Sequence, residues 1–116
     1  MAEVYRGRKA WLDKPLLTIE NDAAYVGQRE FGEDPVLAFD GDRIYRGRRG
    51  VLDMPVAVVD GDHVYRWPRG FMADPVATIR GAEVHARKDW TDTPIATVEG
   101  GGRMSAACAA VYLLMM

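Results

Sequence analysis

Apolar and polar residues recur along the chain with a period of twenty, so the sequence consists of five copies of one unit. The copies align without a gap until the last, which is one residue shorter. A fixed period of this length is typical of repeat proteins, in which each unit is a small element that packs on its neighbours. The five units span Ala2–Asn21, Asp22–Gly41, Asp42–Gly61, Asp62–Gly81 and Ala82–Gly100.

Each unit contains two short runs that favour β-strands. The first is centred on a pair such as Ile44-Tyr45, and the second follows a proline, as in Val56–Val59. β-Branched and aromatic residues suit a pleated, part-buried surface. Between units, Asp40-Gly41 predicts a two-residue type I′ turn, and hence an antiparallel hairpin. That turn would place Phe39 opposite Asp42, Leu37 opposite Ile44, and Val36 opposite Tyr45.

Alternation along these strands divides the predicted sheet into two faces. One face carries the columns of Val4, Leu17 and Ile19, and the other carries the columns of Leu16, Thr18 and the tyrosines. Both faces are more apolar than a sheet with one solvated side requires. We therefore expect both faces to be covered.

The end of the chain changes character and predicts a helix. After Gly100–Gly102 we expect a sixth first strand at Arg103-Met104, followed by a helix over Ser105–Met116 with Ser105 as N-cap. This segment has no charged side chain and is too short for a bilayer, which needs about twenty residues, so burial is expected. Small residues in one inner column would let the helix approach the sheet: Ala57, Ala77 and Ala96. The alternative is an exposed tail that attaches to a membrane surface or a partner.

These patterns predict an all-β fold in one domain, 1–116, with repeats and a short closing strand over 2–104 and the helix over 105–116. About ten short antiparallel strands would form a meander that curls or closes around the helix. The alternative is a two-sheet β-solenoid of five coils capped by the helix. The two differ in strand direction, since a solenoid stacks equivalent strands in parallel.

Aromatic residues are the candidates for a binding surface. One column of the repeat and the middle of the longer loops would supply it: Tyr5, Tyr25, Tyr45, Tyr65, His85, Trp11, Phe31, Phe71 and Trp90. Such rings can form platforms for sugars or extended polymers. Aromatic residues on sheets also pack against neighbouring strands, and this structural role is the competing interpretation.

Charge and composition narrow the function classes. The net charge of −2 argues against a nucleic-acid partner, because such domains carry a strongly basic face. Basic residues that follow the tyrosines could bind an anion, but the net charge near zero favours the interpretation in which acidic residues later in each loop pair with them. No Cys/His spacing or ordered oxygen ligands indicate a metal or cofactor. One cysteine, Cys108, and no apolar leader near the start favour a cytoplasmic protein.

The leading functional hypothesis is a structural or binding module without catalysis, which could self-associate through a sheet face or an open edge strand. A rival is an enzyme, or a ligand-binding site, located where the repeat is broken in the fifth unit. Its residues would be His85, Arg87, Lys88, Asp89, Trp90 and Asp92. A third hypothesis is membrane-surface attachment through the terminal helix.

Two resemblances bear on these expectations. The phrase Asp-Gly-x-x-Val/Ile-Tyr-x-Gly, as at Asp40–Gly47, resembles the MORN repeat, which forms a meandering sheet and mediates membrane or protein contacts. The chain lacks that repeat's second aromatic phrase and longer period, so the function is not carried over. The five copies followed by Gly101–Ala107 are similar to short uncharacterised bacterial proteins built from twenty-residue hairpins, a resemblance that implies no known activity.

Overall fold

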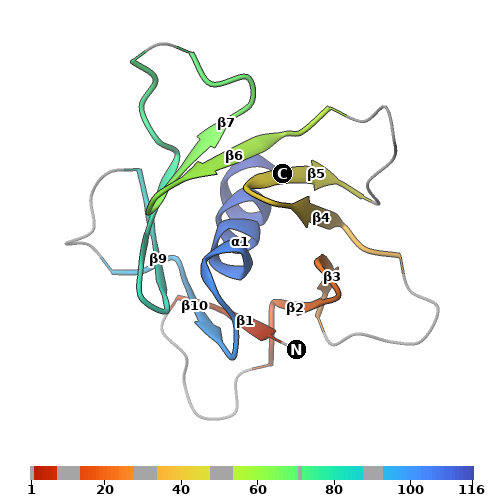
Figure 1. Cartoon of the computed structure of the whole chain (residues 1–116). Helices are drawn as coiled ribbons and strands as arrows, with labels where there is room; N and C mark the ends of the chain where they lie inside the picture. Colours follow the sequence, from red (N-terminus) through yellow and green to blue (C-terminus); the bar gives the residue numbers. More distant parts are fainter. Residues whose placement is uncertain (1, 8–13, 28–33, 48–53, 71, 88–92) are drawn as a thin grey trace.

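The fold is a closed ring of ten antiparallel strands around one helix. The structure is a computed structural model, and it describes residues 2–7, 14–27, 34–47, 54–70, 72–87 and 93–116. Figure 1 shows the strands arranged around the helix α1, which runs through the middle of the ring. The elements are β1 (Ala2–Arg6), β2 (Leu17–Glu20), β3 (Ala23–Val26), β4 (Leu37–Asp40), β5 (Arg43–Arg46), β6 (Ala57–Asp60), β7 (His63–Arg66), β8 (Ala77–Arg80), β9 (Glu83–Ala86), β10 (Ala96–Glu99) and α1 (Arg103–Met115).

Closure comes from the two ends of the repeat array. Strand β1 pairs with both β2 and β10, so Val4 lies opposite Leu17 on one side and Val98 on the other. All the strand pairs are antiparallel, which confirms the meander and excludes the solenoid alternative. The ring that the described strands form has no open edge, so the edge strand that the sequence left available for self-association is not present in it.

The hairpin turns lie one residue later than predicted. Asp40 pairs with Arg43 and Phe39 with Ile44, so the turn residues are Gly41-Asp42 and the expected Asp40-Gly41 turn is wrong. Gly41 has a φ of +62° and supplies the first central position of the turn, where glycine is favoured in a type II′ geometry. The shift moves each pair by two positions, an even number, and therefore the predicted division of residues between the two faces is retained.

The helix also begins earlier than predicted. Its first residue is Arg103 and its N-cap is Gly102, so neither the sixth strand at Arg103-Met104 nor the cap at Ser105 is present. The reason is the closure itself, because β10 already pairs with β1 and no position remains beside it for another strand. The amide of Ala106 instead donates to the carbonyl of Gly102 at 3.3 Å, which starts the helix.

The core lies between the inner face of the ring and α1. Every residue from Ser105 to Val111 is buried, as expected for a helix without charge on any side. The helix packs most extensively against β8, β9 and β10, where Ala77 and Ala96 leave room for it. The larger Leu17 and Leu37, both fully buried, lie on the other side of the ring. The exposed-tail alternative is therefore wrong: the middle of α1, Ser105–Val111, is enclosed, and only its two ends reach the surface.

The connection between β10 and α1 leaves no space for a side chain at Gly101. A Cβ there would lie 2.6 Å from Cβ of Ala2 and 2.7 Å from Oγ of Ser105. We expect Gly101→Ala to lower the free energy of unfolding by about 1–3 kcal/mol, the usual cost of overpacking. Chemical denaturation measures the change. Gly102→Ser is the matched control, because a Cβ at Gly102 meets nothing within 4 Å and serine is a good N-cap. Equal stability of the two variants would contradict the expected steric block.

Candidate functional site

The tyrosine column faces outward from the ring but is buried. Tyr5, Tyr25, Tyr45 and Tyr65 are between 5% and 8% exposed. The guanidinium of Arg69 lies 3.8 Å from the centre of the Tyr65 ring and pairs with the carboxylate of Asp60. Rings covered in this way do not form an open platform, which favours the packing interpretation of the column. The loop aromatics Trp11, Phe31, Phe71 and Trp90 lie outside the described residues.

His85 takes the tyrosine position in the fifth unit and is only 2% exposed. Its Nε2 lies 3.2 Å from Oε1 of Glu83, two residues earlier on the same face of β9. Within the part of the chain that the structure describes, Nδ1 of this ring has no hydrogen-bond partner. The side chain lines neither of the pockets around Leu114, so it stands apart from them.

The end of the ring where α1 finishes is named the barrel mouth. A column that is mostly arginine surrounds the tip of the helix at this end. The last residue of each first strand has the inward phase of Val4 and lies at this end. That column reads Arg6, Val26, Arg46, Arg66 and Ala86. Leu113 and Leu114 of α1 line pockets together with several of these residues, which places the helix tip inside the basic column.

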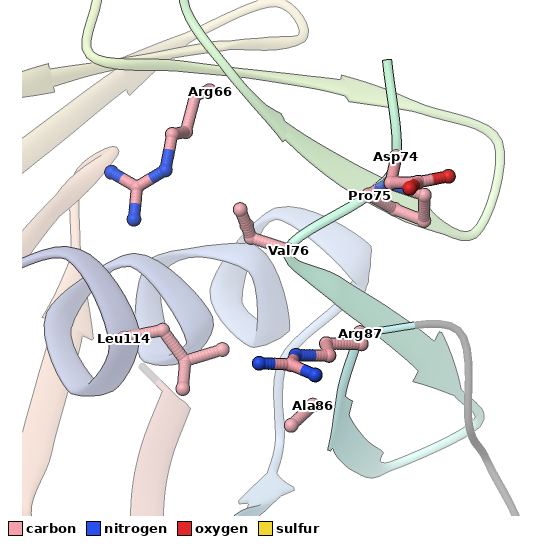
Figure 2. A pocket seen from close by; sticks show the side chains of 7 residues that line it. All are labelled: Arg66, Asp74, Pro75, Val76, Ala86, Arg87 and Leu114. Carbon is pink, nitrogen blue, oxygen red and sulfur yellow. The ribbon is translucent and has the colours of Figure 1, made fainter. Parts of the chain in front are cut away.

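A pocket at the barrel mouth has a volume of about 580 Å³. Figure 2 shows the guanidinium groups of Arg66 and Arg87 extending toward the space beside Leu114, with Val76 between them. The carboxylate of Asp74 turns away from that space. The described residues that line it are Arg66, Asp74, Pro75, Val76, Ala86, Arg87 and Leu114. The pocket thus combines two cations with an apolar floor.

The pocket opens where the repeat departs from its own pattern. Ala86 stands in the column that elsewhere holds arginine or valine, and its short side chain leaves a gap at the mouth. Arg87 stands in the column of Gly7, Gly27 and Gly47 and keeps their left-handed backbone, with a φ of +56°. Its carbonyl accepts a hydrogen bond from Oγ1 of Thr78 at 2.6 Å. The backbone that carries the second guanidinium is therefore fixed.

The described residues neutralise neither guanidinium of the pocket. Among them, the side chains of Arg66 and Arg87 form no ion pair or hydrogen bond. Arginine presents a planar fork of donors that matches carboxylate and phosphate oxygens in pairs. Two arginines that pair with no described residue and lie over an apolar floor suit an anion that carries an apolar group.

Other chemistry is sparse in the described ranges. They contain no group of three His, Cys, Asp or Glu side chains able to hold a metal ion. None of their helices has the length and apolar character needed to cross a bilayer. Of the rival site in the fifth unit, Arg87 lines the pocket and His85 does not, while Lys88, Asp89, Trp90 and Asp92 lie outside the described residues.

The thiol of Cys108 is unreactive because the strands enclose this part of α1 and bury the side chain. Desolvation raises its pKa to about 12, so almost no thiolate forms at neutral or mildly alkaline pH. We expect native protein to resist the thiol reagent dithionitrobenzoate, and protein unfolded in guanidinium chloride to react fully. The rate of release of the coloured product measures both. Rapid reaction in the native state would show that the ring opens readily around α1.

Sequence reasoning placed a rival site in the fifth unit and included Arg87 in it, but it missed Arg66 and the gap at Ala86, although the repeat alignment contained a sign of them. Arg66 and Arg87 belonged to the basic residues that were expected to pair within their own loops. A small residue in the arginine column, followed by an arginine in the glycine column, occurs only in the fifth unit. Comparing columns for such exchanges would have located the pocket.

Comparison with known proteins gives a family. The model of a family described as "6-fold beta flower protein" matches residues 4–106. No curated protein and no solved structure matched the chain. The likeness to MORN repeats is not confirmed by this match. The description refers to a six-fold arrangement, whereas the described strands of this chain form four hairpins, β2–β3, β4–β5, β6–β7 and β8–β9, and a fifth pair in which β1 joins β10.

Proposed function

The chain belongs to the 6-fold beta flower family, whose description names an architecture and no reaction, and we propose that it is a small binding module without catalysis. We infer that its ligand is an anion with an apolar group and that it binds in the pocket of Arg66 and Arg87. One observation carries this proposal: two guanidiniums that pair with no described residue extend over a floor formed by Val76, Pro75 and Leu114.

The energetics favour such a ligand over a simple ion. A charge-assisted hydrogen bond contributes about 1.5–3 kcal/mol, and bidentate contacts from arginine add specificity. Burying an apolar group against the floor adds roughly 25 cal/mol for each Å² removed from water. A volume of 580 Å³ lies within the range of pockets that hold small organic molecules. Inorganic phosphate would use only the first of these contributions.

The make-up of the pocket also supports binding rather than catalysis. Among the described residues that line it, the titratable side chains are those of Arg66, Arg87 and Asp74. Arginine stays protonated and cannot serve as a general base, and the carboxylate of Asp74 turns away from the space. The described lining of the pocket offers no serine, cysteine, lysine or histidine as a nucleophile or base.

Titration of the protein with decyl phosphate, kept below its micelle concentration, tests the proposal by calorimetry. We expect saturable binding that weakens at least about tenfold in Arg66→Ala and in Arg87→Gly, since each loses charge-assisted bonds. Arg87→Gly is informative because glycine suits the positive φ at this position, so loss of binding cannot be ascribed to loss of the fold.

The matched control is Arg80→Ala, which removes an arginine from the opposite end of the ring. Its affinity should equal that of the unchanged protein. Affinity for decyl phosphate that survives both pocket substitutions, or that falls equally in the control, would rule out this pocket as the site.

A further inference from the structure

The near-zero net charge conceals a strong separation of charge between the two ends of the ring. We name the end opposite the barrel mouth the turn end; it carries the hairpin turns and the start of α1. Nine acidic and three basic residues lie there: Glu3, Glu20, Asp22, Asp40, Asp42, Asp60, Asp62, Glu83, Glu99, Arg43, Arg80 and Arg103. The described residues of the barrel mouth have five basic and two acidic members: Arg6, Lys14, Arg46, Arg66, Arg87, Asp34 and Asp74. Arg69 also belongs to the turn end because its guanidinium pairs with the carboxylate of Asp60 there, so the formal charges are −5 and +3.

Exposed apolar side chains gather at the same end as the positive charge. Among the described residues, Met54 is 70% exposed, Met116 is 50% exposed and Val26 is 44% exposed. Met54 immediately precedes the second strand of its unit, Val26 ends β3, and Met116 follows the last turn of α1. All three lie at the barrel mouth and outside the 580 Å³ pocket. A single small ligand would leave them in water.

We propose that the barrel mouth docks on the surface of an anionic lipid bilayer and that the pocket receives a phosphate-bearing lipid headgroup. The docking rests on the proposed function, because the anion with an apolar group that binds in the pocket would be a lipid of that bilayer. The molecule is a flat body of 42 × 38 × 20 Å, so a whole face can meet a plane. Basic residues near an anionic bilayer are attracted electrostatically, and exposed methionines and leucines can enter the interface between headgroups and acyl chains.

The charge separation gives the docked protein one orientation. The acidic turn end is repelled by anionic headgroups, while the basic mouth is attracted, so the axis of α1 points its last turn at the bilayer. This differs from attachment through an exposed helix lying on the surface, because Ser105–Val111 remain enclosed by the ring. Within α1 and its C-cap, only Leu113, Leu114 and the terminal methionines would meet lipid, beside Val26 and Met54 of the barrel mouth.

Vesicle co-sedimentation tests the docking. One set of vesicles contains equal parts of phosphatidylcholine and phosphatidylglycerol, and the other contains phosphatidylcholine alone. We expect binding to the first set at low salt, weak binding to the second, and loss of binding at high salt. The double substitution Arg6→Glu with Arg46→Glu reverses charge at the mouth outside the 580 Å³ pocket, and should weaken vesicle binding at least about tenfold.

The charge-matched control is Arg80→Glu with Arg103→Glu at the turn end, which changes the net charge equally and should leave vesicle binding unaltered. Equal loss in both double variants, or no binding of the unchanged protein to anionic vesicles, overturns the docking. If decyl phosphate still binds in that case, the proposed function stands, and the ligand is a free molecule that does not come from a bilayer. Vesicle binding without decyl phosphate binding would overturn the pocket as the headgroup site.

Discussion

Replacing Val111 with aspartate is expected to destabilise the protein more than truncating any one apolar side chain of the core. Val111 is fully buried where α1 passes through the ring, and an aspartate there would lose its hydration without gaining a partner in the apolar core. Substitutions that bury an unpaired charge reach the extreme of the observed range, above about 4 kcal/mol. With a total stability of about 5–15 kcal/mol, much of the protein should be unfolded. Circular dichroism and thermal melting measure the loss.

Met116→Asp is the matched control for this prediction. It places the same carboxylate only five residues further along the chain, at a side chain that is 50% exposed. Its melting temperature should change little, because an exposed carboxylate keeps its hydration. A Val111→Asp variant as stable as the control would mean that α1 is not enclosed by the strands.

The second large effect is expected from Leu37→Ala. Leu37 is fully buried on the inner face of β4, at a position where β6, β8 and β10 carry alanine. Removing its side chain leaves a cavity beside α1, and such truncations cost about 2–5 kcal/mol. The free energy of unfolding from denaturant titration measures the change.

Met54→Ala removes a side chain of similar size that is 70% exposed, and should cost little. A small cost for Leu37→Ala as well would indicate that α1 can move toward β4 and fill the space. That outcome would contradict the interpretation that the leucines set the distance of the helix from this side of the ring.

The architecture was largely predictable because the same pattern of apolar and polar residues recurs in five units. Alternation at Val4-Tyr5 and its equivalents assigned the two faces correctly, and the charge-free sequence after Ser105 indicated an enclosed helix. The exact turn was not predictable, since Asp40-Gly41 and Gly41-Asp42 both satisfy the preference of glycine for a positive φ. The two choices differ by an even shift, so no pattern of apolar residues distinguishes them.

Closure of the ring was less accessible to sequence reasoning. Arg103-Met104 matches Arg43-Ile44 and predicted a further strand, yet β1 occupies the place beside β10. Which strand fills that place depends on how many strands encircle the helix, a property of the whole ring. The pocket was predicted only in part: the break in the fifth unit marked Arg87 as a candidate site residue, but the repeat pattern did not connect it with Arg66 and Ala86.

The position of α1 also determines the order in which the protein can become folded during synthesis. The ribosome releases the ten strands first, and the helix that fills the centre of the ring emerges after them. Until Val111 and its neighbours are available, the inner faces of all ten strands have nothing to cover them, and β1 must wait for β10. Domains that can fold from the N-terminus do so while they are made. This ring reaches its native state only once α1 has left the ribosome, and short-lived incomplete rings expose the apolar surfaces that chaperones recognise.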